Sequence, residues 1–274
     1  MSKLEVVMAT MGQTDFSLVE KLNIKCNVLF ANQTDNNSYV ETETEHGKAR
    51  MVSTTTRGVG VDRNIGISYS VGNILLFADD DLVYNSDMPQ KVKKAFEELE
   101  EADVIIFGVN ISKNGEICRT MLHKTGKLPV LKSMKYGTHA VAIRRSSLLR
   151  ENLKFNELFG GGCIYSHGED SDFIFSCYKR KLKVYAYEYV LGTTAKDEST
   201  WFKGFDEKYF YDAGALSKNT FGLLSYPHML RLAIKAKSQD KMTIGKKIEV
   251  MLAGYKNYKN NLPYGEWKKG KNNE

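Results

Sequence analysis

The chain has 274 residues, of which 42% are hydrophobic and 26% are charged, a composition typical of folded globular proteins rather than disordered ones. This length allows one large core or two modest ones. No window approaches the ~18 uninterrupted apolar residues of a membrane-spanning helix, and the first residues lack the basic and then apolar pattern of a signal peptide. We therefore expect a cytoplasmic protein.

The net charge of +6 is concentrated in the last quarter of the chain. From Trp201 onward there are 14 lysines and arginines against 7 acidic residues, whereas the two signs nearly balance before that point. This asymmetry predicts an anionic partner for the C-terminal part alone, either a membrane surface or a nucleic acid.

Two common kinds of site are not indicated. The four cysteines lie far apart with no C-x-x-C pair, which favours buried reduced thiols over a zinc site or a disulfide framework. The sequence has no G-x-x-x-x-G-K-[S/T] motif and so no P-loop, and the R-G-V-G-V-D stretch at 57–62 lacks the third glycine of a dinucleotide-binding fingerprint.

Strand and helix patterns alternate through the first hundred residues. Apolar, often β-branched runs at 4–10, 26–31, 51–56 and 74–78 predict strands, and amphipathic stretches at 16–22, 61–70 and 89–102 predict helices. Residues 32–47 are polar and acidic and are interpreted as a loop. The alternation predicts an α/β fold with a largely parallel central sheet flanked by helices.

The pattern continues less regularly in the second half. Strands are expected at 103–111 and 138–143, with a hairpin turn at Asn114 and Gly115. A helix that begins at Glu169 would bury Phe173, Ile174 and Cys177. Two further helices, at 228–237 and 244–255, alternate apolar and basic faces.

Three consecutive carboxylates follow the predicted strand at 74–78. Asp79, Asp80 and Asp81 repel one another, so a bound cation would offset the repulsion, and carboxylate oxygens favour hard ions such as Mg²⁺ or Mn²⁺. The alternative is an acidic turn that caps the next segment.

The predicted topology brings further polar residues to the same place. In a parallel sheet the carboxyl ends of the strands meet at one edge, so Arg63, the loop 10–13 and the loop 32–35 should face the cleft that holds the three aspartates. A diphosphate bridged to the carboxylates by a metal, with Arg63 adding charge-assisted contacts, would use all of these groups. The alternative for Arg63 is a surface salt bridge to Asp62 or Glu5.

A second constellation lies at 159–175. The triple glycine at 160–162 predicts a mobile loop, and Glu169 and Asp170 open a helix. The two acidic residues could simply cap the helix. The positive end of the helix dipole would also keep Asp170 ionised, as a general base requires, with His167 as the alternative base.

The order of the motifs resembles family-2 glycosyltransferases of the GT-A fold, particularly bacterial enzymes that build surface polysaccharides. The chain carries T-x-x-x-x-D after the first strand, N-Q-T-D after the second, R-N-I-G-I in a helix, then F-A-D-D-D and finally G-E-D-S-D-F. The resemblance covers about residues 4–200.

The resemblance implies roles for individual residues. Asp79 and Asp81 match the D-x-D pair that binds nucleotide ribose and a Mn²⁺ or Mg²⁺ ion, and Asp170 matches the catalytic base. The N-Q-T-D segment departs from the usual D-D-G-S-T-D, and the His that many relatives place before an S-T pair is missing at Ser199 and Thr200, which puts a third metal ligand in doubt. The remaining implied contacts are to the nucleotide sugar, from Thr10, Gln13, Asp35, Arg63, Asp79 and Asp80, and to the acceptor side, from His167, Glu169 and Trp201.

The resemblance implies an inverting sugar transfer of the hexosyltransferase class. The donor would be a nucleoside diphosphate sugar, with a UDP-sugar as the first expectation. The acceptor would be a hydroxyl of a glycan or of a lipid-linked molecule. The catalytic domain would span residues 1–200, with the nucleotide sugar bound by about 1–111 and the acceptor by about 112–200. A basic helical extension would follow over 201–274.

The C-terminal extension has two interpretations. A basic amphipathic helix with aromatic residues at its borders can lie on an anionic leaflet, which would make the protein peripheral at the inner face of the plasma membrane. The alternative is a solvated helical cap. Trp201 could stack on an acceptor sugar, although large aromatic residues more often belong to a core.

Two other functions remain open at this point. A metal-dependent nucleotidyltransferase would also use clustered carboxylates and a diphosphate site, but would release pyrophosphate instead of a nucleoside diphosphate. A nucleic-acid-binding protein would use the basic tail and bind with steep salt dependence. The tail has no recognised nucleic-acid motif, so a nucleic acid is not the expected partner.

Overall fold

The computed structural model describes residues 3–195, 204–239 and 241–272 and divides the chain into two compact units. Unit 1 comprises Met1–Arg57, Val61–Phe155 and Phe173–Glu198, and unit 2 comprises Gly58–Gly60, Asn156–Asp172 and Ser199–Glu274. Trp201 and the Ser199–Thr200 pair lie outside the described residues.

A single mixed sheet forms the centre of unit 1. Its strands follow in spatial order as β3 (Ser38–Thr44), β4 (Gly47–Thr54), β2 (Asn27–Gln33), β1 (Leu4–Met11), β5 (Ile74–Ala78), β10 (Val141–Arg144), β7 (Val104–Lys113), β11 (Val184–Ala195) and β6 (Leu82–Tyr84). Two short strands extend it, with β8 (Glu116–Met121) beside β7 and β9 (Gly126–Lys127) beside β11.

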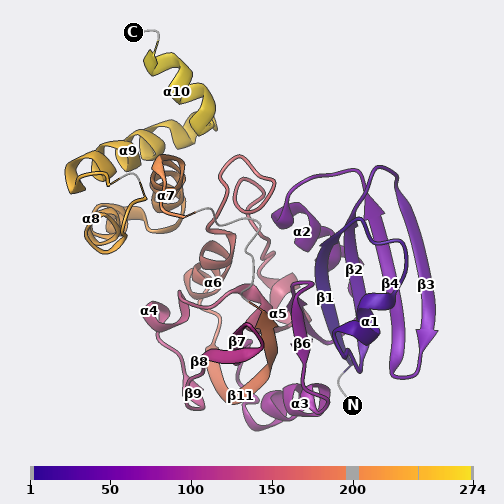
Figure 1. The fold of residues 1–274 in the computed structure, drawn as a ribbon. Coiled ribbons are helices and arrows are strands. Elements are labelled where there is room, and N and C mark those ends of the chain that lie inside the picture. The colour runs from indigo at the N-terminus through magenta and orange to yellow at the C-terminus, as the bar shows by residue number, and fades with distance from the viewer. Residues whose placement is uncertain (1–2, 196–203, 240, 273–274) are drawn as a thin grey trace. The chain divides into compact units, whose positions relative to one another are not determined.

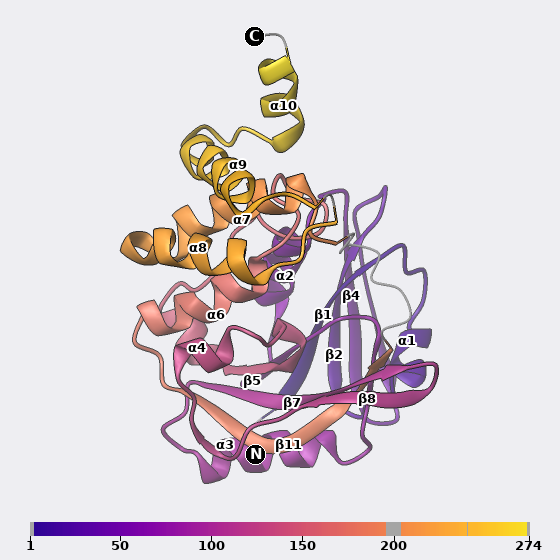
Figure 2. The same cartoon turned by 60° about the vertical axis from the view of Figure 1, so that its left-hand side comes forward.

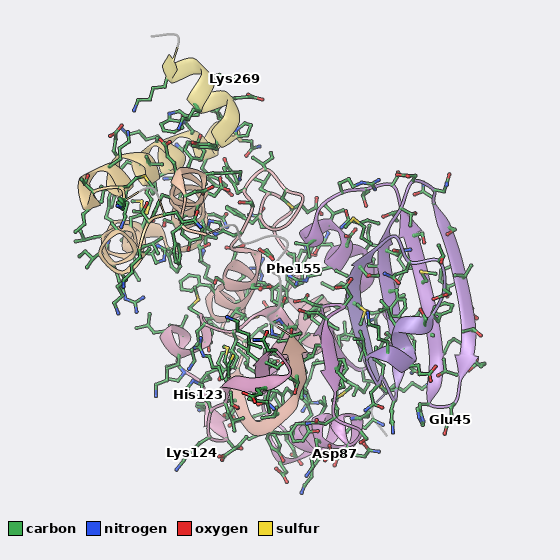
Figure 3. All side chains as sticks on the ribbon, in the orientation of Figure 1. Glu45, Asp87, His123, Lys124, Phe155 and Lys269 are labelled. Atoms are coloured by element: carbon green, nitrogen blue, oxygen red, sulfur yellow. The ribbon has the colours of Figure 1, made fainter. Side chains whose placement is uncertain are left out.

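The strands that matter for the site are parallel. β4, β2, β1 and β5 run in the same direction as neighbours, so their carboxyl ends meet at one edge of the sheet (Figure 1). Glu45, labelled in Figure 3, marks the turn between β3 and β4 and therefore the opposite edge. Beyond β5 the sheet becomes mixed, with β10 antiparallel to both of its neighbours and β11 parallel to β7.

The apolar runs of the sequence explain the core of unit 1. All residues of β5 are buried, as are Val6, Val7 and Met8 in the middle of β1. The unit's helices are α1 (Ser17–Lys21), α2 (Val59–Tyr69), α3 (Met88–Glu98), α4 (Val130–Ser133), α5 (Arg145–Arg150) and the greater part of α6 (Glu169–Lys179). The α/β fold, with a central sheet flanked by helices, is as predicted.

Helix α6 packs against the sheet through contacts among three phenylalanines. The ring of Phe173 stacks on Phe155 with centroids 4.0 Å apart and meets the edge of Phe77 in β5 at 5.4 Å. Phe155 is labelled in Figure 3. Phe173, Ile174 and Cys177 are all buried, so the predicted inner face of this helix is confirmed.

Two local predictions differ from the structure. The segment 32–47, expected to be a loop, contains the edge strand β3, whose residues are nearly all exposed on both faces and so show no apolar alternation. The strand predicted at 138–143 begins with a 3-10 turn, η1 (Thr138–Ala140), and only β10 is extended. The hairpin turn at Asn114 and Gly115 is present, with positive φ at both residues.

Unit 2 is built from helices around its own apolar cluster. They are α7 (Glu207–Thr220), η2 (Gly222–Leu224), α8 (Ser225–Lys235), α9 (Ile244–Asn257), η3 (Tyr258–Asn260) and α10 (Tyr264–Asn272). A Cβ atom on Gly214 would lie 1.8 Å from the carbonyl oxygen of Met251, and one on Gly254 would lie 1.9 Å from that of Tyr211. These two glycines therefore allow α7 and α9 to pack backbone to backbone.

The division into units does not follow the boundary predicted near residue 200. Phe159 and Tyr165 are fully buried in the same cluster as Phe210 and Tyr211 of α7, so the segment before α6 belongs with the C-terminal helices. Among the described residues, none of the helices is both long and apolar enough to span a bilayer.

Candidate active site

The site is built at the carboxyl edge of the parallel strands in unit 1. Asp79, Asp80 and Asp81 follow the last residue of β5 directly, with Asp79 half-buried and the next two exposed. The predicted position of the aspartates at the end of a buried strand is confirmed.

Arg63 approaches the aspartates from the first turns of α2. Its Nη2 donates to Oδ1 of Asp79 over 2.9 Å, and its guanidinium lies 5.2 Å from the ring centre of Phe155. The arginine is only 3% exposed. Glu5, which was considered as an alternative salt-bridge partner of Arg63, pairs with Arg50 instead.

A histidine completes the surroundings of Asp79. Nδ1 of His139, in η1, lies 3.2 Å from Oδ2 of Asp79. Burial by itself would raise the pKa of Asp79, but the charge of Arg63 and the contacts with His139 outweigh it and hold this pKa well below its usual value. Asp79 is therefore an ionised carboxylate held in place on both oxygens.

The loop after β1 reaches the second aspartate. Oγ1 of Thr10, which is buried, donates to Oδ2 of Asp80 over 3.1 Å. Three residues later, the backbone N–H of Gln13 donates to Oδ1 of Asn32 at 3.0 Å, and the Asn32 amide donates back to the Gln13 carbonyl at 2.8 Å. The loops after β1 and β2 are thus tied together, as expected for loops that share one cleft.

Asp81 is held by strand β11. Its Oδ2 accepts a hydrogen bond of 2.8 Å from the hydroxyl of Thr194 in β11. Partial burial raises the pKa of Asp81, and the negative charges of Asp79 and Asp80 raise it further, against the hydrogen bond from Thr194. A cation bound here would relieve this repulsion.

The aspartates do not by themselves complete a metal-binding group. The described part of the chain contains no group of three or more His, Cys, Asp or Glu side chains placed to hold a metal ion. Mg²⁺ in phosphate-binding sites is typically held by one or two carboxylates, with substrate phosphates and water filling the other positions. Asp81 fits that requirement better than Asp79, because both oxygens of Asp79 already have partners.

Asp35 lies on the exposed rim of the loop after β2. Its carboxylate pairs with Arg57 at 2.8 Å. Its contacts are therefore with Arg57 and not with the three aspartates, and its assignment to the nucleobase or ribose stays a prediction.

A neighbour of Arg63 is unusual in its burial. The side chain of Asp62 is fully buried in α2. Burial raises its pKa to about 7, although the nearby Gln33 side chain and the charges of Arg57 and Arg63 oppose the shift. From the sequence, Asp62 was considered as a possible salt-bridge partner of Arg63.

The second constellation lies in unit 2, at the start of α6. Glycines 160, 162 and 168 adopt positive φ, and Gly160 N–H donates to the carbonyl of Tyr165 over 2.8 Å. These glycines therefore allow the backbone to turn just before Glu169 and Asp170, the first two residues of the helix.

Helix α7 holds this segment at two points. The buried carboxylate of Asp172 accepts hydrogen bonds of 2.7 Å from Asn219 and from Thr220. The buried carboxylate of Asp212 accepts from the backbone N–H of Ser166 at 2.9 Å and from its hydroxyl at 2.7 Å. The residues on both sides of Asp170 are thus fixed by α7.

His167 is packed between these two anchors. Its ring stacks on Tyr209 with centroids 4.2 Å apart, and its Nε2 lies 3.1 Å from the Tyr209 carbonyl oxygen. Burial lowers the pKa of His167. These contacts favour a structural histidine over the alternative general base.

Several residues that form these hydrogen bonds were not predicted from the sequence. His139 is a lone histidine in a segment interpreted as a strand, and Thr194 lies far from the aspartates in sequence. The third acid of the G-E-D-S-D-F motif, Asp172, was a signal present in the sequence but not interpreted.

The class of protein is indicated by a mixed sheet with three aspartates after β5 and a buried arginine from α2 at the carboxyl edge of its parallel strands. Residues 17–155 match the family model described as glycosyl transferase family 2. The chain belongs to glycosyl transferase family 2, and the predicted family is confirmed.

Solved structures of S. aureus TarS share the fold. TarS 1–349 is 13% identical, with 93% of this chain and 71% of that chain covered at a TM-score of 0.55. The complex of TarS 1–349 with UDP-GlcNAc is 14% identical, with 96% of this chain and 74% of that chain covered at a TM-score of 0.57. The complex with UDP is 13% identical, with 96% of this chain and 93% of that chain covered at a TM-score of 0.56. No curated protein matches the sequence.

Proposed function

We propose that this protein transfers a sugar from a nucleoside diphosphate sugar to a hydroxyl group of a glycan or lipid-linked acceptor, with inversion at the anomeric carbon. The observation that carries the proposal is the assembly of Arg63, His139 and Thr10 around Asp79 and Asp80 at the carboxyl edge of parallel strands. Membership of glycosyl transferase family 2 supports the transferase class.

The donor is proposed to be a UDP-sugar. TarS, which has this fold, has been solved with UDP and with UDP-GlcNAc. Here, Thr10, Gln13, Asp35, Asp79 and Asp80 would contact the nucleotide sugar. Arg63 would position the carboxylate of Asp79 and add a positive charge near the diphosphate.

A divalent cation is part of this proposal. Asp81, with Asp79 beside it, would hold Mn²⁺ or Mg²⁺ together with the donor phosphates. When bound, such an ion supplies positive charge to the diphosphate that leaves. The raised pKa of Asp81 among three acids supports a cation at this position.

Asp170 is the proposed general base. In the reaction, the acceptor oxygen forms a bond to the anomeric carbon, its proton passes to Asp170, and the bond from that carbon to the diphosphate oxygen breaks. Asp170 lies in the first turn of α6, at the positive end of the helix dipole.

The acceptor side is proposed to include Glu169, His167 and Trp201. A lipid-linked acceptor would bring the enzyme to the inner face of the plasma membrane.

Two measurements test the proposal together. A thermal-shift panel of nucleoside diphosphates and their sugars, with and without Mn²⁺, should give its largest stabilisation with one uridine nucleotide and Mn²⁺. Product analysis with that donor and a hydroxyl acceptor should then detect the nucleoside diphosphate. Release of pyrophosphate would indicate nucleotidyl transfer instead, and no stabilisation by any nucleotide would contradict the donor site.

A further inference from the structure

The outer face of η2 and α8 exposes large apolar side chains that the fold does not need. Leu223, Leu224, Tyr226, Leu230 and Ile234 are between 50% and 97% exposed. We name these five residues the α8 surface. Tyr226, Leu230 and Ile234 follow at intervals of four and therefore share one helix face.

The opposite face of the same helix accounts for its packing within unit 2. Met229 and Ala233 are buried in the apolar cluster with Phe210 of α7 and Val250 of α9. In Figure 2, α8 packs beside these two helices, which leaves its other side outermost in unit 2. The α8 surface is thus additional to the core, and exposed apolar patches of this kind mark sites of interaction.

Basic residues adjoin the α8 surface. Arg231 and Lys235 each follow one of its apolar residues directly, and both are exposed. Together with Pro227, Leu230 and Ile234 they line a hollow of about 310 Å³. Between Phe221 and Gln239 the sequence contains no Asp or Glu, so positive charge is unopposed along this segment.

We propose that the α8 surface docks on an anionic lipid membrane, with Leu223, Leu230 and Ile234 entering the region between head groups and acyl chains. Arg231 and Lys235 would contact the negative head groups, and Tyr226 has the amphipathic ring that favours this interface. The charge pattern disfavours a second copy as the occupant, because a two-fold contact would bring the same basic residues of both chains together. The inference concerns binding alone and does not depend on the proposed reaction.

Co-sedimentation with lipid vesicles tests this inference without any sugar donor. The wild-type protein should bind vesicles of phosphatidylcholine and phosphatidylglycerol, bind weakly to phosphatidylcholine alone, and be released by salt. The double variant Leu230→Ser with Ile234→Ser should lose at least about tenfold in partitioning, because two exposed apolar side chains no longer enter the lipid. Arg231→Gln with Lys235→Gln should lose about 25-fold in partitioning, at roughly fivefold for each charge.

Matched variants in unit 1 serve as controls. Leu131→Ser, at a residue that is 87% exposed on α4, and Lys124→Gln with Lys127→Gln should bind vesicles as the wild type does. All variants should keep the wild-type melting temperature, since only exposed side chains change. Should the Leu230 and Ile234 pair fail to fold, Leu223→Ser, at the most exposed of the five, replaces it.

Three results would overturn the inference. The first is that the wild-type protein fails to bind anionic vesicles. The second is equal binding by the wild type and the α8 variants. The third is a dimer, detected by light scattering, that Leu230→Ser with Ile234→Ser separates while vesicle binding is absent.

Discussion

The guanidinium of Arg63 donates a 2.9 Å hydrogen bond to the carboxylate of Asp79, so the first turns of α2 are joined to the end of β5. Because the arginine is almost fully buried, this pair is part of the packed structure and is not a mobile surface contact. The groups proposed to receive the diphosphate are therefore already assembled by the fold.

Replacing Arg63 with Ala should weaken UDP binding by at least about tenfold and lower the free energy of unfolding by about 1–3 kcal/mol, because Asp79 loses its partner at the edge of the sheet. Calorimetric titration and urea denaturation measure the two effects. Arg57→Ala removes an exposed ion pair and hydrogen bonds to exposed backbone carbonyls, so it should cost less stability than Arg63→Ala. Equal stability losses in the two variants would argue against a structural role for the Arg63 pair.

The substitution Asp170→Asn should lower kcat by about 10²- to 10⁴-fold, which is the usual contribution of a general base, with little change in donor affinity. The neutral side chain keeps its size but can no longer accept the proton. Steady-state kinetics with the donor identified by the thermal-shift panel provide the test. Transfer at a nearly normal rate would remove Asp170 from the mechanism.

Chelation by EDTA should abolish activity, and Mn²⁺ or Mg²⁺ should restore it. Asp81→Asn should raise the metal concentration needed for half-maximal activity by about tenfold or more, because the carboxylate proposed to bind the cation loses its charge. Thr194→Val, which removes only the hydroxyl bonded to Asp81, should have a smaller effect. Full activity in chelator would contradict a cation at this position.

Asp172→Ala should lower kcat through the position of α6 and leave the KM for the donor unchanged. The change leaves Asn219 and Thr220 without their shared acceptor and should cost about 1–3 kcal/mol of stability. Asp172→Asn keeps an oxygen that can accept both bonds and should restore most of kcat. If Asn failed to rescue kcat although stability returned, positioning through these bonds would be the wrong explanation.

Asp62→Asn should stabilise the protein above neutral pH. The pKa of Asp62 in the folded state is raised from 3.8 to about 7, so its charged form is disfavoured on folding and wild-type stability declines as pH rises from about 4 through 7. The neutral variant lacks this decline and should be about 2–4 kcal/mol more stable than wild type at pH 8. Urea denaturation from pH 4 to pH 8 should show the difference growing with pH, and a difference independent of pH would contradict the buried ionisation.

Local sequence patterns were sufficient to predict a helix or strand where one of its faces, or the whole element, is buried. The strand Ile74–Ala78 was predicted to the residue because all five of its side chains are apolar and an acid follows at once. Phe173, Ile174 and Cys177 marked the inner face of α6 by their spacing. The edge strand β3 was missed because both of its faces are exposed, and its side chains carry no periodic signal.

Contacts between segments that are distant in the sequence could not be predicted from local patterns. That Arg63 and Asp79 lie at the same edge of the sheet could be argued from strand direction, but the approach of His139 depends on how a 3-10 turn meets β5. The attachment of the segment before α6 to unit 2 likewise depends on Phe159 and Tyr165 packing among helices that begin some forty residues later.

Calorimetric titration of UDP in the presence of Mn²⁺ is the most direct test of a nucleotide site at the carboxyl edge of the sheet. The wild-type protein should bind, and Asp80→Ala and Asp81→Ala should each bind at least about tenfold more weakly while keeping the wild-type melting temperature. Unchanged affinity in both variants, or no binding by the wild type to any nucleoside diphosphate, would contradict the account.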